Sequence, residues 1–261
     1  FLQCLHHLLP VAALGATLGG RSVGLLAALF AALAPMSMQL AHYFTTDSWL
    51  TFFVALTLLA CVHAACGGGA RRFALAGAGV GLAMATKGSV FTLAIPVAIA
   101  LSCNAMASHS ATRVTRVARN GLAAAVSAVA AFFVFEPYAF FRPDVYLRDL
   151  RTQADIVSGR FDVPFTRVYA GTTPLLYQLE QFVRWGYGPV AGLLAIIGLA
   201  LLLEQAKRDR SAPARVLVGW VGAYCTVLLF ADAKFLRYLE PLAPVFAVTA
   251  ALALVQVART I

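Results

Sequence analysis

The sequence contains few charged residues. Only 12% of the 261 residues are Asp, Glu, Lys or Arg, whereas 61% are hydrophobic, and the mean hydropathy is +0.82. Soluble globular chains carry about 25% charged residues, so this composition excludes an ordinary soluble domain. Such a chain is solvated by lipid, where only helices and closed barrels satisfy their own backbone hydrogen bonds.

The apolar runs also lack the alternation of polar and apolar residues that is typical of strands. They are continuous and rich in Ala and Leu, which excludes a transmembrane β-barrel. The sequence therefore predicts an all-α fold, a polytopic transmembrane helical bundle.

Metal-binding and disulfide patterns are missing as well. No pair among the five cysteines has metal-ligand spacing, and we interpret them as small apolar packing residues. His6 and His7 are adjacent, so on a helix they point about 100° apart, which is a poor arrangement for one metal ion.

The sequence has no initiator Met and no signal peptide, and it opens at Phe1 within a hydrophobic run. We expect a piece of a longer protein that lacks at least the N-terminal end.

The charges that are present fall into two sets when the polar breaks between apolar runs are taken alternately. One set has 11 basic and 2 acidic residues, net +9, and the other has 9 of each. The positive-inside rule places the first set in the cytoplasm. Because its charges occur in short loops between spans, this rule explains them better than nucleic-acid binding does. The first set comprises Arg21, Arg71, Arg72, Arg113, Arg116, Arg119, Lys207, Arg208, Arg210, Arg215 and Arg259, with Glu204 and Asp209.

The apolar stretches predict about nine membrane helices, with short interfacial helices on the outer face. The stretch 73–106 is apolar except for Lys87 and lies between two basic clusters. Because both clusters belong to the cytoplasmic set, the chain must cross the membrane an even number of times between them. We therefore expect 73–86 to cross outward, Lys87 and Gly88 to form a turn on the outer side, and 89–106 to cross back. The other expected spans are 1–19, 24–44, 48–65, 121–141, 187–204, 215–231 and 241–258.

Residues 142–186 form the only sizeable polar region, on the outer face. Pro143 is suited to a helix start, and the mixed pattern that follows predicts a helix lying in the interface. Ser158 and Gly159 should end that helix. Thr173 and Pro174 predict a second short helix that runs to Arg184.

Asp47 follows His42 in the outer loop before the span 48–65. It is either the N-cap of that span or a functional carboxylate at the membrane surface, and the two roles are compatible. His42 is the histidine closest in sequence to Asp47, so we include it in the candidate site.

Basic residues on the outer face oppose the positive-inside bias and are therefore candidates for binding an anion. Lys87 is either a lysine that extends to the interface or a phosphate ligand. Lys234 and Arg237, beside Tyr238, are spaced i, i+3, so on a helix they would share one face as a phosphate clamp, although interfacial anchoring is the alternative. Arg167 and Tyr169 precede an expected helix start, which is either an anion site or an ordinary solvated loop.

Several short segments together resemble the GT-C superfamily of polytopic glycosyltransferases, specifically the bacterial glycosyltransferase family 39 and protein O-mannosyltransferase-like group. They lie in this order along most of the chain: Gly24 to Ala28 with Ala34-Pro35, His42 to Phe53, Gly81 to Lys87, Glu136-Pro137-Tyr138, Tyr169 to Pro174, Trp185 to Pro189 and Lys234 to Pro241.

The resemblance implies a single GT-C-like transmembrane domain over 1–261, lacking the first helix and first outer loop, with 142–186 as its outer-face segment. It implies transfer of a sugar from a polyprenyl-phosphate donor to a protein, lipid or glycan acceptor, on the periplasmic side of a bacterial cytoplasmic membrane. Lys87, Lys234 and Arg237 would hold the carrier phosphate, and Asp47 would be a supporting acid. The main catalytic acid would precede Phe1, and a divalent metal ion could help the cations to bind and stabilise the leaving phosphate.

Two other function classes compete with this one. A transporter or lipid flippase would show charges facing one another within spans and broken helices in two related halves. Lys87 is the only charge inside a hydrophobic stretch, and no internal repeat is visible. The other class is a membrane scaffold that binds partners without catalysis.

Overall fold

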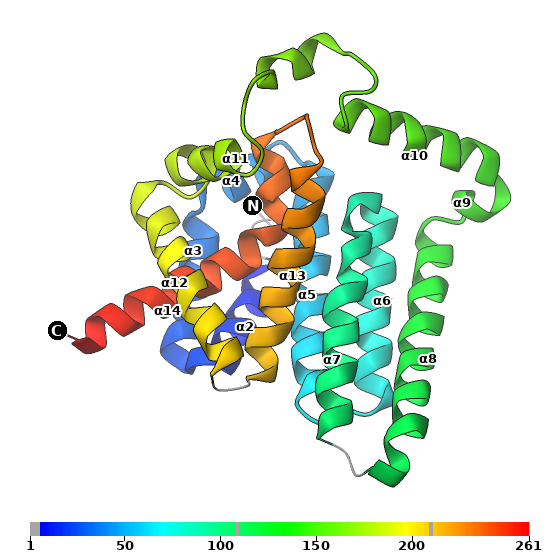
Figure 1. Cartoon of the computed structure of the whole chain (residues 1–261), viewed down its shortest axis with the longest axis vertical. Coiled ribbons are helices and arrows are strands. Elements are labelled where there is room, and N and C mark those ends of the chain that lie inside the picture. The colour runs from blue at the N-terminus through cyan, green and yellow to red at the C-terminus, as the bar shows by residue number, and fades with distance from the viewer. Residues whose placement is uncertain (1–5, 108–109, 209–210, 261) are drawn as a thin grey trace.

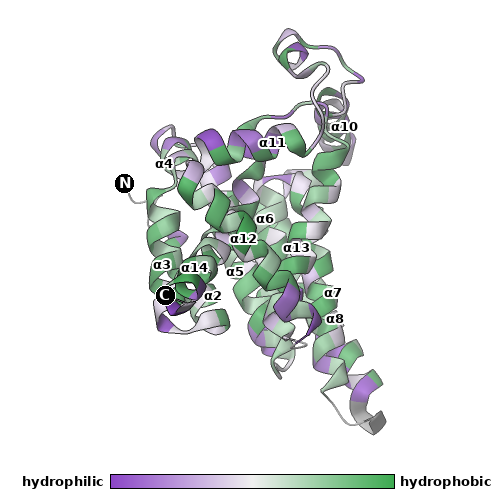
Figure 2. Cartoon of the chain, turned by 60° about the vertical axis from the view of Figure 1, so that its left-hand side comes forward, coloured by the Kyte–Doolittle hydropathy of each residue, from purple (hydrophilic) through white to green (hydrophobic). Residues whose placement is uncertain are grey.

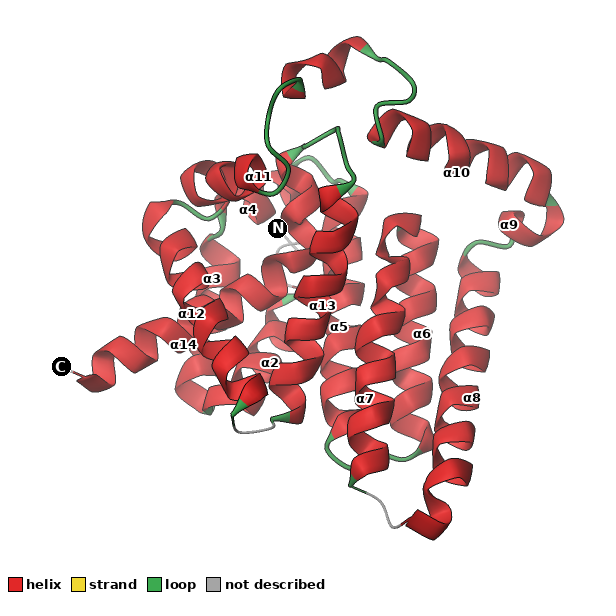
Figure 3. Ribbon diagram, viewed as in Figure 1, coloured by secondary structure: helices red, strands yellow, loops and turns green. Residues whose placement is uncertain are grey.

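The structure, a computed structural model, describes residues 6–107, 110–208 and 211–260. Its described residues are helical apart from turns and loops, and none is in a strand (Figure 3). The all-α prediction is therefore confirmed. Figure 2 shows apolar residues along the bundle and polar residues at its two ends.

The first two described helices form a hairpin in which small residues pack closely. α2 (Leu8–Gly19) and α3 (Arg21–Leu33) are joined by Gly20, whose φ of +81° favours glycine. Ala34 separates α3 from α4 (Pro35–His42), and these two helices are bent by 55°. The span expected over 24–44 is therefore broken, because Pro35 has no backbone N–H with which to continue the helix.

The next four helices stand side by side (Figure 1). α5 (Thr46–Ala65) packs on α6 (Ala70–Thr86), and α6 packs on α8 (Ser110–Phe135). Between them in sequence, the short helix η1 (Gly88–Leu93) leads into α7 (Ala94–Met106). The turn expected at Lys87 and Gly88 is confirmed.

The long polar segment lies across one end of the bundle (Figure 1). After the short α9 (Tyr138–Phe141), α10 (Pro143–Val157) has Pro143 in its first turn, and Gly159 follows it with a φ of +72°. No residue of α10 is buried. The expected helix and its end are thus confirmed, and its place in the membrane interface stays a prediction.

The second helix of this segment differs from the expectation. η2 (Pro164–Tyr169) comes first, and α11 (Leu176–Gln181) is capped by Leu175 rather than by Thr173. The main-chain N–H of Leu175 donates to Oε1 of Gln178 at 2.6 Å. Gln178 thus accepts the N–H of the N-cap residue itself, whereas the leucine side chain has no acceptor for the N–H groups of the first turn. The chain then continues through the π-helical turn η3 (Phe182–Gly186).

Three further helices complete the bundle: α12 (Pro189–Lys207), α13 (Ala212–Leu229) and, after η4 (Leu236–Leu242), α14 (Ala243–Thr260). The indole N–H of Trp220 donates to the carbonyl of Pro241 at 3.1 Å, and the hydroxyl of Tyr187 donates to that of Ala243 at 2.8 Å. The first bond satisfies the carbonyl of Pro241, since Pro244, three residues further on, has no N–H to donate to it, and the second ties Tyr187 to the first residue of α14.

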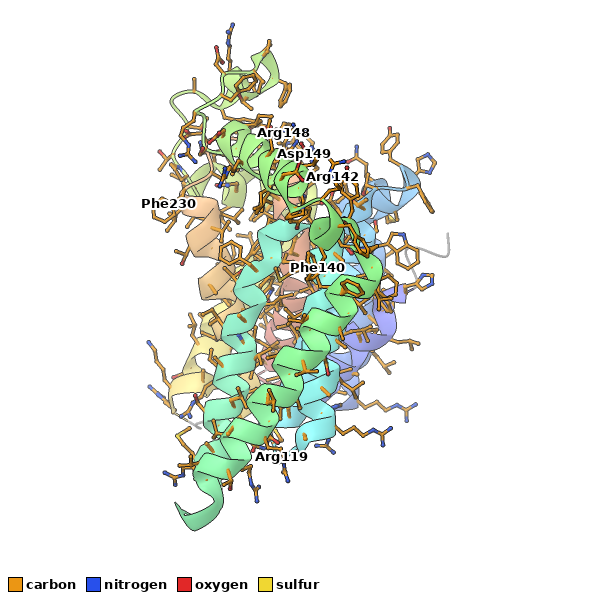
Figure 4. All side chains as sticks on the ribbon, turned by 90° about the vertical axis from the view of Figure 1, so that its right-hand side faces the viewer. Arg119, Phe140, Arg142, Arg148, Asp149 and Phe230 are labelled. Atoms are coloured by element: carbon orange, nitrogen blue, oxygen red, sulfur yellow. The ribbon has the colours of Figure 1, made fainter. Side chains whose placement is uncertain are left out.

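Six helices of the described chain are long and apolar enough to cross a membrane, or seven if the bent pair α3 and α4 counts as one span. The protein is thus an integral, multi-pass membrane protein, and the count of nine helices stays a prediction. Figure 4 shows that Arg119 lies at the opposite end of the bundle from Arg142 and Arg148. We call the end with Arg21, Arg71, Arg72, Arg119 and Lys207 the basic end, and the end with α10 and α11 the loop end.

Candidate functional site

An ion pair joins two candidate residues at the loop end of the bundle. Nζ of Lys87 lies 2.9 Å from Oδ1 of Asp47, and the side chains are 31% and 6% exposed. Thr45 is the N-cap of α5, so Asp47 falls within the first turn. The prediction that Asp47 itself caps the helix is therefore wrong. A carboxylate in a first turn is still favoured, because it faces the positive end of the helix dipole.

Lys87 is held in place by its backbone as well as by its partner. It follows the last residue of α6 in an extended conformation, with φ −161° and ψ 119°. This conformation turns the chain from α6 into η1. The ammonium also lies 5.0 Å from the ring centroid of Tyr238, a cation–π distance. The turn therefore brings Lys87 between α5 and the segment that contains Tyr238.

Lys234 and Arg237 do not share a helical face. Lys234 lies in the loop before η4, which begins at Leu236, so the expected shared helical face is wrong, and the phosphate clamp stays a prediction. The ammonium of Lys234, only 3% exposed as a residue, donates to the carbonyl of Asp232 at 3.1 Å. This hydrogen bond closes the turn that contains both residues.

Arg237, by contrast, is exposed and lies on aromatic rings. Its guanidinium carbon is 4.9 Å from the ring centroid of Phe235 and 6.0 Å from that of Tyr238. Among the residues that the structure describes, no carboxylate forms an ion pair with Arg237. Stacking leaves the edge of a guanidinium, with its N–H groups, free to bind an anion.

Tyr169 belongs to the same aromatic cluster. Its ring centroid lies 5.3 Å from that of Phe235 and 5.8 Å from that of Tyr177. Burial raises the pKa of the Tyr169 hydroxyl above its usual value, so this phenol stays neutral and can donate a hydrogen bond over the whole physiological range. The structure thus brings together Asp47, Lys87, Tyr169, Arg237 and Tyr238.

Arg167 and His42 have other surroundings. The guanidinium of Arg167 makes a two-pronged contact with Asp162, with Nε to Oδ1 at 3.0 Å and Nη2 to Oδ2 at 2.6 Å. This contact lowers the pKa of Asp162 and raises that of Arg167, so the charge of Arg167 is already matched. His42 is exposed, with its ring centroid 5.5 Å from that of Tyr43.

Sequence reasoning missed Glu240. It is 1% exposed, and Oε2 of its carboxyl has no hydrogen-bond partner in the described part of the chain. The hydroxyl of Thr51 lies within hydrogen-bonding distance of the carbonyls of both Asp47 and Glu240, at 2.9 and 3.3 Å. Glu240 is thereby fixed beside the start of α5. An acidic residue directly before an apolar span is a signal that could have revealed it.

The residues present do not form a metal site. Within 6–107, 110–208 and 211–260, no group of three or more His, Cys, Asp or Glu side chains is placed to hold a metal ion. Asp47 is engaged by Lys87 and faces no such cluster. The divalent metal ion considered from the sequence therefore stays a prediction without ligands.

Comparisons with known proteins agree with this architecture. A family model described as dolichyl-phosphate-mannose-protein mannosyltransferase matches residues 1–141, which include Asp47 and Lys87. No curated protein matches the sequence. Among solved structures, the fold is similar to that of the apo oligosaccharyltransferase of Archaeoglobus fulgidus, with a TM-score of 0.63 and 17% identity.

Two further structures of that archaeal enzyme are also similar. One is AglB in complex with an inhibitory peptide and a dolichol-phosphate, with a TM-score of 0.58 and 16% identity. The other is a complex with zinc and sulfate, with a TM-score of 0.59 and 20% identity. Each covers 99% of this chain, but this chain spans only 37% to 39% of theirs. At these identities the likeness is one of fold.

The order of the segments along the sequence, the helical bundle and the family model therefore agree, and the resemblance to GT-C glycosyltransferases is confirmed. The family model covers more than half of the 261 residues. The chain belongs to the dolichyl-phosphate-mannose-protein mannosyltransferase family.

Proposed function

We propose that this chain is part of a membrane glycosyltransferase that moves a sugar from a polyprenyl-phosphate donor to an acceptor hydroxyl or amide. The family match over residues 1–141 carries the proposal. The complex of the similar archaeal enzyme with dolichol-phosphate supports a lipid-linked donor. Its complex with an inhibitory peptide supports a protein acceptor, ahead of a lipid or glycan.

The arrangement around Tyr238 supports a phosphate site in which Arg237 is the principal ligand. When a glycosyl bond to phosphate breaks, negative charge grows on the leaving oxygens, and a preorganised cation stabilises it. Arg237 is exposed, stacked on Phe235 and without a described carboxylate partner. Lys234 is buried in its own loop, so we assign it to the support of this segment rather than to phosphate binding.

Lys87 takes a second place in the proposed site. Its ammonium already pairs with Asp47 and lies over Tyr238. An ammonium has three N–H donors, so a phosphate oxygen can bind without breaking the ion pair. Asp47 then acts as a positioning residue that holds Lys87, not as the base that takes the acceptor proton.

Tyr169 and Tyr238 complete the proposed site as neutral hydroxyl donors. His42 and Arg167 remain candidates only for contacts with the acceptor, because they lie on exposed stretches of the loop end. We place this end of the bundle on the periplasmic side of a bacterial cytoplasmic membrane. The support is the positive-inside rule, because the basic end carries the surplus of arginine and lysine.

The test measures transfer of a labelled sugar from a polyprenyl-phosphate donor to a peptide, in membranes that contain the full-length protein of which this chain is a part. Replacing Arg237 by Ala should reduce transfer about a hundredfold. Arg237→Lys should keep only part of the parent transfer rate, because lysine lacks the planar guanidinium that donates two hydrogen bonds to a phosphate. Arg148→Ala is the matched control, since Arg148 is also an exposed arginine of the loop end. Transfer by Arg237→Ala at the parent rate would refute the assignment.

A transporter or flippase for an anionic lipid-linked substrate is the alternative class. It predicts movement of the lipid across vesicles without formation of a new glycosidic bond. Translocation assayed in the same membranes, with no acceptor peptide, separates the two functions.

A further inference from the structure

We propose that a cavity at the basic end binds the phosphodiester headgroup of an anionic phospholipid, independently of the proposed transferase site. The cavity has a volume of about 330 Å³ and is bounded by α12, α14 and the turn between α2 and α3. This volume is at the lower end of the range for small-molecule sites. Its lining residues are Leu18, Gly19, Val23, Leu201, Glu204, Gln205, Arg208, Leu252, Val255, Gln256 and Arg259.

The two helices line the cavity with the same pattern of residue types. α12 contributes Leu201, Gln205 and Arg208, together with Glu204, at relative positions 0, 4, 7 and 3. On a helix, residues with these separations lie on one face. The face therefore changes from leucine to glutamine to arginine toward the end of the helix.

α14 repeats this pattern with Leu252, Gln256 and Arg259, and it has Val255 where α12 has Glu204. α12 and α14 pack on each other, and their last turns line the same cavity beside the turn between α2 and α3; Figure 1 shows the C-terminal part of α14 extending sideways from the bundle. Both walls of the cavity thus become more polar in the same direction. The wall deepest in the bundle is apolar, and the mouth carries two guanidinium groups.

This gradient matches the order of groups in a phospholipid. Acyl chains contact leucine and valine, ester and glycerol oxygens accept hydrogen bonds from glutamine amides, and the phosphate meets arginine. Basic pockets between membrane helices on the cytoplasmic side recognise anionic headgroups in this way. A soluble anion would use the arginines but would leave the apolar wall without a partner.

The charge at the mouth fits a single phosphodiester. Arg208 pairs with Glu204 at 2.9 Å, which leaves one net positive charge among the lining residues. Arg259 has no ion pair or hydrogen-bond acceptor within the described part of the chain. The C-terminal ends of two helices present partly negative carbonyls here, which would repel a phosphate. The positive charges of Arg208 and Arg259 offset this repulsion.

The experiment compares phosphatidylglycerol with phosphatidylcholine as the lipid added to the purified full chain. Native mass spectrometry measures the lipid that is retained, and the temperature of unfolding measures protection. We expect phosphatidylglycerol to be retained and to raise the unfolding temperature. The double variant Arg208→Gln with Arg259→Gln should retain it about thirtyfold more weakly, from about 1 kcal/mol for each arginine.

The control is the double variant Arg71→Gln with Arg119→Gln. It removes the same amount of charge from the basic end but outside the cavity, since both arginines are exposed there. It should retain phosphatidylglycerol like the parent. Equal losses in the two double variants would show a non-specific effect of charge and would overturn the proposal. Equal retention in all three proteins would also overturn it.

Two further measurements distinguish a lipid site from a free-anion site and from a loss of folding. Inorganic phosphate at millimolar concentration should give no protection; if it protects as well as the lipid, the site binds a free anion and the proposal is wrong. If the Arg208 and Arg259 variant unfolds in phosphatidylcholine, Val255→Trp replaces it, because Trp fills the half-buried wall and keeps both arginines. Unchanged lipid retention by Val255→Trp would then refute the site.

Discussion

Nζ of Lys87 lies 2.9 Å from Oδ1 of Asp47, which ties the residue that follows α6 to the first turn of α5. Thr51, one turn further along α5, lies within hydrogen-bonding distance of the carbonyl of Glu240 in η4. Two successive turns of α5 are therefore joined to two segments that lie far from them in sequence. The candidate site depends on these joints, because they hold Lys87 beside Tyr238.

Breaking the Asp47–Lys87 pair from one side should be costly. In Lys87→Met the carboxylate of Asp47, whose side chain is 6% exposed, would be left buried without its partner. We expect a loss of about 2 kcal/mol, less than the value for a fully buried pair because Lys87 is partly exposed. Thermal unfolding in one fixed detergent measures the loss.

The double variant Asp47→Asn with Lys87→Met is the control for this prediction. It removes both charges, so it should be more stable than Lys87→Met alone. Additive losses in the double-mutant cycle would show that the two side chains do not interact.

The contact between α6 and α8 should be sensitive to a single methyl group. A Cβ added at Gly77 would collide with the carbonyl of Ala124, and one added at Gly81 would collide with the carbonyl of Ala128. Backbone cannot move aside as a side chain can, so Gly77→Ala should lower stability by about 1–3 kcal/mol. The unfolding temperature of the purified protein measures this.

Gly121→Ala is the matched control in α8 itself. A Cβ there would meet only Cδ1 of Leu101, at 3.8 Å, an ordinary contact. Because alanine favours helix by about 1 kcal/mol over glycine, this variant should be as stable as the parent or more stable. A Gly77→Ala variant that unfolds at the parent temperature would contradict the close approach.

The two ends of the bundle should react with an impermeant thiol reagent from opposite sides of the membrane. Thr152 of α10 and Lys207 of α12 are both exposed. In a background with every cysteine replaced by serine, Thr152→Cys should be labelled in intact cells. Lys207→Cys should be labelled only after the membrane is permeabilised, because the positive-inside rule places it in the cytoplasm. Labelling of both from outside would refute the assigned topology.

Low pH should loosen the loop that holds Arg167. Because Arg167 lowers the pKa of Asp162, the contribution of this pair is present above the pKa of a free aspartate, about 4. It is lost as the pH falls through the lowered pKa. An acid-active protease should therefore cut residues 158–175 at a constant rate from about pH 6 to about pH 4, and faster below that.

Asp162→Asn should already be cut at the faster rate at about pH 6, because its amide makes no charge-assisted bond. Asp144→Asn, which loses only an exposed contact of 3.4 Å with Arg142, should be cut like the parent. The same pH profile in Asp162→Asn and the parent would show that the pair does not order the loop.

Much of the fold could be predicted from local patterns. Length and hydropathy predicted the apolar helices, the parity of the basic clusters predicted the turn at Lys87, and Pro143 and Gly159 marked the limits of α10. The predictions that were wrong concerned caps and faces. Thr45 rather than Asp47 is the N-cap of α5, and Leu175 rather than Thr173 is that of α11, because the N-cap lies where the backbone first becomes helical and side-chain type alone does not fix that residue.

The candidate site was harder to predict, because its residues come from separate segments, of which even Asp47 and Lys87 are 40 positions apart. The sequence marked Lys87, Arg237 and Tyr238 as unusual charges and neighbours on the outer face. It gave no sign that Lys87 pairs with Asp47, that Lys234 turns inward, or that Glu240 is buried.

The sequence by itself determined that the protein is helical, lies in a membrane and has one basic end, because burial in lipid and the cost of charge depend on residue type and order alone. Only the tertiary structure decided which charges are matched. An ion pair such as Asp47–Lys87, and a cavity with Arg208 and Arg259 at its mouth, exist because helices distant in sequence pack side by side.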